Sequence, residues 1–372
     1  MIPFVRVLKY GNIVDEPDRI EKFGLGTTYF SCKTDFGKLF ISGLAGTNFY
    51  GQADTGFHLI GENIDNVWYS KTSVGMVAQS GNTYYMLGMN YNASSLGGSK
   101  FDITSRINAV LSTLPVGTSI LDIQVEPHLM ILFSNGDLYG VGYNSSGQLG
   151  TGNTTIVSVL RLLASNVKKF MTCQTGTIYI TNNGDFYGCG IDYNISLGGS
   201  NRLSYTKFGT STYTDCYLLG GISGLQNILA YDSVQGYWVG QGTNVTQLGG
   251  TFANTSVLSR LTPRPSTYVR DNSIADGYGN INMSTVGGQL YVTGSNFNGL
   301  TGLGISTNTV TGDWTLVPGS IGVKQVRGTN TASMYLTESA EIYATGQGLN
   351  GLFAGVTNTY NRYTKLNINI GG

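Results

Sequence analysis

The side chains best suited to catalysis or metal binding are few in this sequence and widely spaced. The two histidines, His58 and His128, lie far apart, and the four cysteines form no C-x-x-C pair. Cysteine–histidine zinc sites bring their ligands in closely spaced pairs, and no G-x-S-x-G, H-E-x-x-H or phosphate-loop motif occurs. We therefore expect no catalytic residue, no metal, no cofactor and no enzymatic activity.

The same residues have simpler structural interpretations. His128 begins an apolar run and is expected to have a structural role there. Paired glycines recur in several places, as turn geometry requires, whereas a single phosphate site would need them once. The cysteines are interpreted as small core residues of a chain made in a reducing compartment. They are Cys32, Cys173, Cys189 and Cys216.

Residues 250–271 are the internal stretch least like the rest of the chain. Arginine and tyrosine are frequent in protein interfaces, and insertions on a repeat scaffold are often where partners bind. The candidate interface residues are Arg260, Arg264, Tyr268 and Arg270. The alternative interpretation is a solvated loop.

Asparagine or aspartate recurs in a set of glycine-rich loops, at residues 90, 144, 192, 244 and 296. We expect these side chains to hydrogen-bond the backbone of their own loops. The next residue is aromatic in three loops, at Tyr91, Tyr193 and Phe297. These three form a candidate aromatic face for protein or glycan contact; the alternative is packing between adjacent loops.

A repeated hairpin must position these loops. Its clearest copy, Leu129 to Gly152, has an apolar strand, an Asn135-Gly136 turn and a second strand. Asn-Gly between apolar runs predicts a type I′ turn. The glycine that ends the second strand recurs about every 50 residues, as a repeat architecture requires. These glycines are Gly43, Gly88, Gly142, Gly190, Gly242, Gly294 and Gly346.

A period of about 50 residues with some four strands per unit predicts an all-β, seven-bladed β-propeller. We expect one such domain over residues 23–372, preceded by a short arm at residues 1–22. The last strand, Tyr363 to Ile370, is expected to pair within the first blade, because this closes the ring and removes sheet edges.

Residues 136–152, GDLYGVGYNSSGQLGTG, resemble the repeat signature of the regulator-of-chromosome-condensation family. That signature joins a dG-x-hydrophobic-aromatic strand to G-x-N and G-Q-L-G-x-G. The fourth unit is also similar, whereas Tyr50-Gly51 and Ala354-Gly355 stand where Leu-Gly is expected. The resemblance spans about residues 23–372 and implies a seven-bladed propeller. It implies no function, because one fold hosts unrelated activities.

The arm has an alternating apolar start followed by a charged run from Asp15 to Asp18. Its opening phrase resembles N-terminal segments of bacteriophage tail and fibre proteins. Two interpretations stay open: a strand on the propeller edge, and an attachment arm that adds a strand to a partner. The arm residues expected to mediate attachment are Ile2, Pro3, Phe4, Val5, Val7 and Tyr10.

Composition excludes several partner classes. The chain has 21 basic residues (lysine plus arginine) and 21 acidic residues (aspartate plus glutamate). The excess of positive charge that nucleic-acid binding needs is therefore missing. No stretch approaches the roughly 18 apolar residues of a membrane span. Arg6 and Lys9 interrupt the apolar run that an export signal would need. We expect no nucleic-acid partner, no membrane insertion and no ordinary cleaved signal.

These features favour a non-enzymatic virion component of a bacteriophage, in the tail, collar or a fibre. It would be made in the host cytoplasm and take part in a multimeric particle. Its partners would be other virion proteins or a cell-surface protein or glycan. The alternative is a soluble cytoplasmic protein-binding propeller, either an inhibitor or a guanine-nucleotide-exchange-type regulator. A propeller enzyme has the least support.

Overall fold

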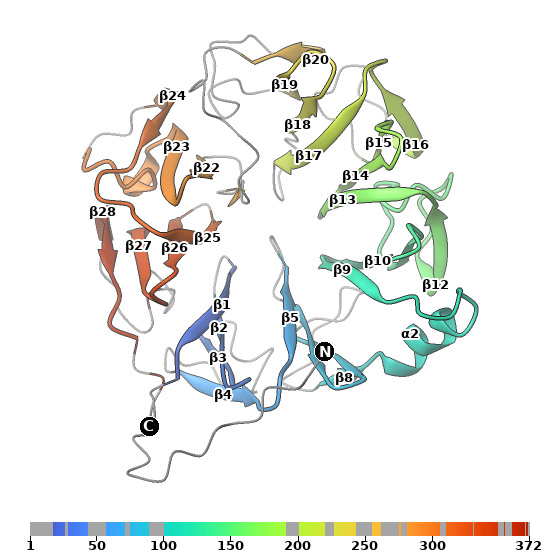
Figure 1. Ribbon diagram of the computed structural model, residues 1–372, viewed down its shortest axis with the longest axis horizontal. Coiled ribbons are helices and arrows are strands. Elements are labelled where there is room, and N and C mark those ends of the chain that lie inside the picture. The colour runs from blue at the N-terminus through green and yellow to red at the C-terminus, as the bar shows by residue number, and fades with distance from the viewer. Residues whose placement is uncertain are drawn as a thin grey trace.

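The computed structural model describes residues 18–26, 29–43, 57–70, 75–88, 100–190, 201–219, 227–242, 255–261, 275–276, 281–305, 310–329, 331–348, 353, 359–368 and 370. The described strands form seven four-stranded antiparallel sheets, which stand around a central axis (Figure 1). The chain is therefore an all-β propeller, as its repeat predicts. Each sheet uses four consecutive strands, with the first strand innermost and the fourth at the rim.

The first four sheets cover the N-terminal half. The first contains β1 (Ile20–Leu25), β2 (Phe30–Thr34), β3 (Leu39–Ser42) and β4 (His58–Gly61). The second contains β5 (Asn66–Tyr69), β6 (Met76–Ser80), β7 (Thr83–Leu87) and β8 (Phe101–Asp102). The third contains β9 (Ile120–Val125), β10 (His128–Phe133), β11 (Leu138–Gly142) and β12 (Val157–Ala164). The fourth contains β13 (Val167–Cys173), β14 (Gly176–Thr181), β15 (Phe186–Gly190) and β16 (Arg202–Phe208).

Three further sheets complete the described part of the chain. The fifth contains β17 (Tyr213–Leu219), β18 (Asn227–Asp232), β19 (Tyr237–Gly242) and β20 (Thr255–Arg260). The sixth contains β21 (Ala275–Asp276), β22 (Ile281–Val286), β23 (Gln289–Ser295) and β24 (Val310–Leu316). The seventh contains β25 (Val323–Gly328), β26 (Ala332–Thr337), β27 (Ile342–Gln347) and β28 (Thr359–Lys365). In the described part of the chain two helical segments interrupt the pattern, α2 (Thr104–Leu111) and the 3₁₀ turn η2 (Phe297–Gly299).

The turn of the β10–β11 hairpin differs from the predicted type. Phe133 N–H donates to Asp137 O at 2.9 Å, and Gly136 N–H donates to Phe133 O at 2.9 Å. Gly136 has φ +86°, whereas Asn135 is absent from the residues with positive φ. The loop is therefore a type I turn followed by a left-handed glycine, and the predicted two-residue type I′ turn is wrong.

The aligned glycines share a conformation that explains their spacing. All seven have a positive φ, between +84° and +155°. L-residues rarely adopt this region, and glycine does so without steric cost. Close packing adds a second reason in two sheets, because a Cβ would collide with Thr175 O at Gly190 and with Thr331 O at Gly346.

The hydrophobic core lies between neighbouring sheets rather than at one centre. One cluster joins the fourth and fifth sheets through residues such as Phe186 and Trp238. Another joins the second and third sheets and includes Ile107 and Val110 from α2. Each sheet alone has two faces to bury, and stacking it against its neighbours buries them.

The predicted ring closure by the C-terminal strand is wrong. β28 spans Thr359–Lys365 and pairs with β27 of its own sheet, not with a strand of the first sheet. The last and first sheets instead meet through one shared cluster, which includes Phe23 of β1 and Met334 of β26. Ile368 and Ile370 pack against that cluster. Side-chain packing replaces strand exchange because each sheet already has its four strands.

The propeller begins earlier than the expected boundary at residue 22. β1 starts at Ile20, which is buried in the core. Asp18 forms an ion pair with Lys38 at 2.8 Å, and Arg19 N–H donates to Asp35 Oδ1 at 3.0 Å. Residues 20–22 therefore belong to the first sheet, and Asp18 and Arg19 are bonded to it.

Candidate functional site

His128 is placed where it supports structure rather than catalysis. It is fully buried at the start of β10, and its Nε2 lies 2.6 Å from Thr172 Oγ1 of the next sheet. Burial lowers the pKa of His128 to about 3, so the imidazole is neutral at physiological pH. His58 lies on β4, in a different sheet.

The four cysteines are buried free thiols, as predicted. Burial raises the pKa of Cys173 to about 11 and raises the pKa values of Cys32 and Cys189 further. Such thiols are poor nucleophiles at neutral pH. Among the residues that the structure describes, no group of three His, Cys, Asp or Glu residues is arranged to hold a metal ion.

The predicted interface loop contributes one described residue, Arg260, the last residue of β20. Its guanidinium carbon lies 4.6 Å from the ring centroid of Tyr237 on β19, and its side chain is exposed. Arg264, Tyr268 and Arg270 lie outside the described residues. An interface formed by these three residues together with Arg260 stays a prediction.

Arg260 lies on a groove at the rim, between the fourth and fifth sheets. The groove has a volume of about 820 Å³, and Gly209–Thr212, which connects β16 to β17, forms part of its lining. Arg202 of β16 faces it from the fourth sheet, with its guanidinium carbon 4.7 Å from the ring centroid of Phe208. Arginine–aromatic stacking therefore occurs on both walls.

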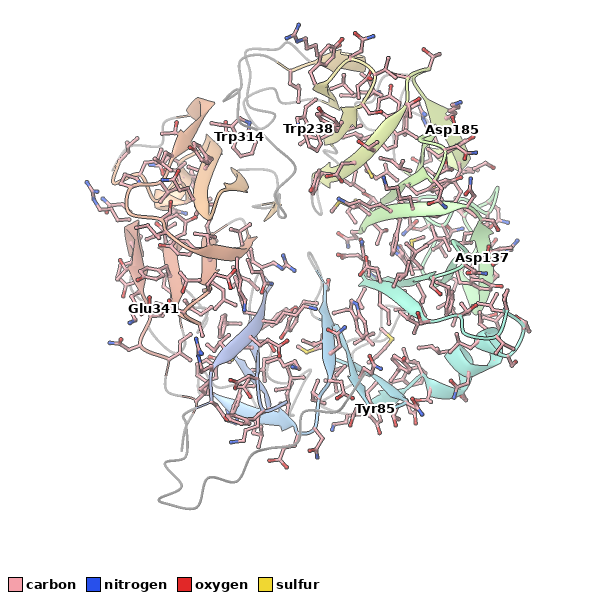
Figure 2. All side chains as sticks on the ribbon, viewed as in Figure 1. Tyr85, Asp137, Asp185, Trp238, Trp314 and Glu341 are labelled. Carbon is pink, nitrogen blue, oxygen red and sulfur yellow. The ribbon has the colours of Figure 1, made fainter. Side chains whose placement is uncertain are left out.

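The charge on the groove is predominantly positive. Arg202, Lys207 and Arg260 line it together with one carboxylate, Asp232. Lys207 pairs with Asp185 at 2.6 Å, toward the outer edge of the fourth sheet (Figure 2).

Asp232, the one carboxylate among the described residues that line the groove, is hydrogen-bonded within the fold. Asp232 Oδ1 accepts hydrogen bonds from Ser211 Oγ and from the N–H groups of Val234 and Gln235, at 2.7–3.0 Å. With Tyr237 against its guanidinium, Arg260 can still donate N–H hydrogen bonds in the guanidinium plane, a geometry that suits a carboxylate from a partner.

The asparagine prediction is confirmed where the loops are described. Asn144 Nδ2 donates to Asn153 O at 2.9 Å and to Thr155 O at 3.2 Å, and its Oδ1 accepts from Leu149 N–H at 2.9 Å. Asn296 makes the corresponding bonds with Ile305 O and Thr301 N–H, at 2.9 and 3.2 Å. These side chains shape their loops and are not exposed for binding.

The aromatic face and the arm are described only in small part. Phe297 is 49% exposed, in η2, which is compatible with a surface role. Tyr91 and Tyr193 lie outside the described residues, so the proposed aromatic face stays a prediction. Residues 1–17 also lie outside them. The arm residues concerned are Ile2, Pro3, Phe4, Val5, Val7 and Tyr10.

Sequence reasoning missed a set of polar contacts that join the innermost strands. The Gln124 side chain of β9 accepts from Thr172 N–H at 2.9 Å and donates to Phe170 O at 3.0 Å, both on β13 of the next sheet. Lys22 of β1 bonds Asn66 and Val67 of β5 in the same direction around the ring. An innermost strand has an unpaired edge, and these side chains occupy it. No local motif marks them, because each partner lies more than 40 residues away.

Together the stacked sheets, inter-sheet cores and central axis define the chain as a β-propeller. No family model matches the sequence. Solved propellers of the RCC1 type have the same fold. Yeast RCC1 (Prp20) bound to Kap60 aligns with a TM-score of 0.71 at 13% identity, over 99% of this chain and 91% of that chain.

Two further structures give the same result. Prp20p from Saccharomyces cerevisiae has a TM-score of 0.71 at 14% identity, over 94% of this chain and 88% of that chain. Human WBSCR16 has a TM-score of 0.67 at 16% identity, over 89% and 95%. At these identities the similarity shows the fold alone. No helix in the described part of the chain is long and apolar enough to cross a membrane.

Proposed function

We propose that this protein is a non-enzymatic binding protein that holds an acidic segment of a protein partner in the rim groove between the fourth and fifth sheets. In this proposal each of the seven four-stranded sheets acts as one blade of the ring. The observation that carries it is the pairing of Arg202 and Arg260, each stacked on an aromatic ring, on opposite walls of one groove of about 820 Å³.

The chemistry of the groove supports a carboxylate-bearing partner. An arginine held by an aromatic ring loses less side-chain entropy when it binds, because part of its freedom is already restricted. Tyr237 adds a half-buried aromatic surface, and arginine and tyrosine are enriched among residues that dominate binding energy. Among the described residues that line the groove are three cations, of which Lys207 already pairs with Asp185, and one carboxylate that is hydrogen-bonded within the fold. The two arginines therefore favour an acidic partner over a basic one.

Related propellers offer an analogy for protein binding. One RCC1 (Prp20) structure was determined bound to Kap60, and another study concerns binding of Prp20p to Gsp1p and histones. Fold similarity of this kind is an analogy and does not identify a partner. The proposal rests on the groove.

We further propose that residues 1–17 attach the propeller to a bacteriophage particle, where other virion proteins are its partners. The alternating apolar residues Ile2, Phe4, Val5 and Val7, next to a charged run, support this attachment role. An arm of this kind can add a strand to a partner sheet.

The groove is tested by affinity capture from native source material, followed by titration of the captured protein with purified variants. Arg260→Gln and Arg202→Gln each remove charge while retaining length, and each is expected to weaken binding about tenfold or more. Arg161→Gln is the matched control, because Arg161 is an exposed arginine on β12, away from the groove. Equal binding by all three variants and the unaltered protein would refute the groove proposal.

The arm is tested separately, by sedimentation of particles with the full chain and with residues 1–17 deleted. Deletion stops before Asp18, so the first sheet keeps its contacts. We expect the full chain to sediment with particles and the truncated, folded chain to stay in the supernatant. Sedimentation of the truncated chain, or a full chain that never sediments, contradicts attachment by the arm and leaves the groove result unaffected.

A further inference from the structure

A second groove lies at the rim between the sixth and seventh sheets, with a volume of about 580 Å³. One wall is the loop between β23 and β24, from Asn298 to Ile305, and the other is the rim strand β28 (Figure 1). None of its residues lines the groove between the fourth and fifth sheets. Its volume is in the range of small-molecule binding sites.

The described lining of this second groove is mostly polar and contains one charged side chain. That side chain is Arg362, which is exposed, and no ion pair within the described residues includes it. Two amides, of Asn298 and Asn361, and two hydroxyls, of Thr359 and Thr364, also line the groove. Each amide supplies both hydrogen-bond donors and an acceptor.

Hydrogen bonds hold the two walls of the groove together. Thr345 Oγ1 of β27 is buried beneath them, 2.8 Å from Gly299 O on one wall and 3.0 Å from Tyr360 O on the other. Gly304 N–H donates to Asn361 O at 2.7 Å across the same junction. Walls fixed in this way lose little conformational freedom when a ligand binds.

The junction between the third and fourth sheets is built in the same way. An isolated bridge joins Thr151 to Ser204 at that junction, and an isolated bridge joins Leu303 to Arg362 at the second groove. In both junctions the glycine after the loop residue donates its N–H, at 2.7 Å, to the carbonyl of the residue before its rim partner. The two junctions can therefore be compared residue by residue.

The comparison shows that the shared scaffold does not require the polar side chains of the second groove. Asn361 and Arg362 occupy the positions that Leu203 and Ser204 hold at the third–fourth junction. The same backbone contacts are thus made there with an apolar and a small side chain. At the second groove, the sequence replaces them with an amide and a guanidinium.

The guanidinium of Arg362 is seated against the opposite wall. A Cβ at Gly304 would lie 2.6 Å from Arg362 Cζ, so the guanidinium packs directly on the backbone of this glycine. At the corresponding Gly152, the nearest atom to such a Cβ is Ser204 Oγ, at 3.7 Å. Arg362 is therefore positioned at the groove by packing.

Asn298 differs from its counterpart as well. It lines the groove with a left-handed backbone, at φ 56° and ψ 25°, a conformation that asparagine adopts more readily than most residues. Its counterpart in the loop of the third sheet is Ser146, which is 6% exposed and is absent from the residues with positive φ. Here too, the departure from the shared scaffold places a hydrogen-bonding side chain at the groove.

We propose that the groove between the sixth and seventh sheets binds a carboxylated sugar residue, a hexuronic or sialic acid. Arg362 donates paired N–H groups to the carboxylate. The amides of Asn298 and Asn361 hydrogen-bond the ring hydroxyls, which both donate and accept as the amides do. One cation among neutral amides and hydroxyls suits a ligand with one carboxylate and several hydroxyl groups better than a phosphate.

The test is isothermal titration and saturation-transfer NMR of the full chain with sodium glucuronate and with N-acetylneuraminate, at pH 7 and constant ionic strength. We expect saturable binding of at least one acid, with a Kd of about 1 mM for a single sugar residue. Glucose keeps the ring without the carboxylate, and acetate keeps the carboxylate without the ring. Each is expected to bind about tenfold more weakly or less.

The variants take their side chains from the third–fourth junction, where the same scaffold folds with them. Arg362→Ser and Asn361→Leu are each expected to weaken binding of the acid about tenfold or more. Arg362→Ser should also abolish the preference for glucuronate over glucose. Arg260→Gln, in the other groove, is the control and should bind as the unaltered chain does. Circular dichroism confirms that each variant is folded.

Three results would overturn the proposal. The first is the absence of saturable binding of both acids to the unaltered chain. The second is binding of acetate or inorganic phosphate as tight as that of the sugar acid, which would reveal a simple anion site. The third is unchanged binding by Arg362→Ser.

A tetrasaccharide that contains glucuronate distinguishes the two sources of such a residue. Tighter binding of the tetrasaccharide than of glucuronate supports the site and indicates a glycan chain as the ligand. Equal binding supports the site and indicates a free sugar acid.

Discussion

The side-chain amide of Gln325 makes two hydrogen bonds to the backbone of Phe23. Its Oε1 accepts from Phe23 N–H at 3.1 Å, and its Nε2 donates to Phe23 O at 2.7 Å. The two residues are 302 positions apart in the chain. They join the seventh sheet to the first, at the seam where a strand exchange was expected and is absent.

Replacing this glutamine is expected to loosen the seam. Gln325→Leu keeps the approximate volume but leaves the edge of β1 without two hydrogen bonds, which should lower the free energy of unfolding by about 1–3 kcal/mol. Urea denaturation measures the change. Gln124→Leu is the matched variant, because Gln124 likewise bonds one backbone N–H and one backbone C=O of the next innermost strand, those of Thr172 and Phe170 on β13. Unchanged stability of Gln325→Leu would show that packing alone closes the ring.

Ala340 is expected to be a site where glycine stabilises the fold. It has φ +66° and occupies the turn position held by Gly136, at φ +86°, and by Gly184, at φ +84°. An L-residue in this region costs about 1–2 kcal/mol, offset in part by the greater chain entropy of glycine. Ala340→Gly should therefore raise the free energy of unfolding by about 0.5–1 kcal/mol.

The reverse change at Gly136 is the control for that prediction. A Cβ there would lie 3.4 Å from Asn166 Cα, an ordinary contact, so backbone strain is the main cost. Gly136→Ala should lower the free energy of unfolding by a similar amount. Thermal denaturation of both variants measures these changes in stability. A lower stability of Ala340→Gly than of the parent would contradict backbone strain at Ala340.

His128 should make the protein sensitive to acid. Burial lowers its folded-state pKa to about 3 from 6.5, so the unfolded chain binds the additional proton between those values. The contribution of neutral His128 to the free energy of unfolding is therefore fully present above pH 6.5. It falls as the pH drops toward 3, with a slope of up to about 1.4 kcal/mol per pH unit.

His128→Gln removes the titrating group and keeps a side-chain amide near Thr172. Denaturant unfolding at pH 7 and pH 4.5 measures the difference between the two proteins, so that the carboxylates common to both cancel. We expect the variant to lose less stability than the parent over this interval. Parallel losses would mean that His128 gains its proton in the folded state.

Lys22 should act in the same direction as His128, but at alkaline pH. Its folded-state pKa is lowered to about 8 from 10.5, so the unfolded chain binds more protons between those values. Its contribution to stability therefore rises as the pH increases from 8 toward 10.5. The buried cysteines act in the other direction, because their folded-state pKa values are raised.

Asn66→Asp isolates the lysine contribution, because the cysteines are common to both proteins. The added carboxylate should raise the pKa of Lys22 toward its ordinary value. We expect the stability difference between Asn66→Asp and the parent to be largest near pH 7 and to shrink by pH 9.5, as measured by urea unfolding at each pH. A difference independent of pH would contradict a lowered pKa of Lys22 in the folded chain.

The periodic glycines made the hairpins and the propeller predictable from sequence. Positive φ is a local requirement, so a glycine such as Gly142 or Gly346 marks its turn without reference to distant residues. The asparagine bonds of Asn144 were predictable for the same reason, since its partners lie within its own loop. The Asn135-Gly136 turn type was not, because the same dipeptide fits both a two-residue and a three-residue loop.

Contacts between sheets required the tertiary structure. The sequence alone contains Gln325 and Phe23, Arg202 and Arg260, and Lys22 and Asn66, but nothing local pairs them. Their proximity depends on how each sheet stacks on the next, which is set by the packing of many apolar side chains at once. The positions of the turns were thus determined by the sequence by itself, whereas the contacts between the first and seventh sheets and the rim groove were decided by the closing of the ring.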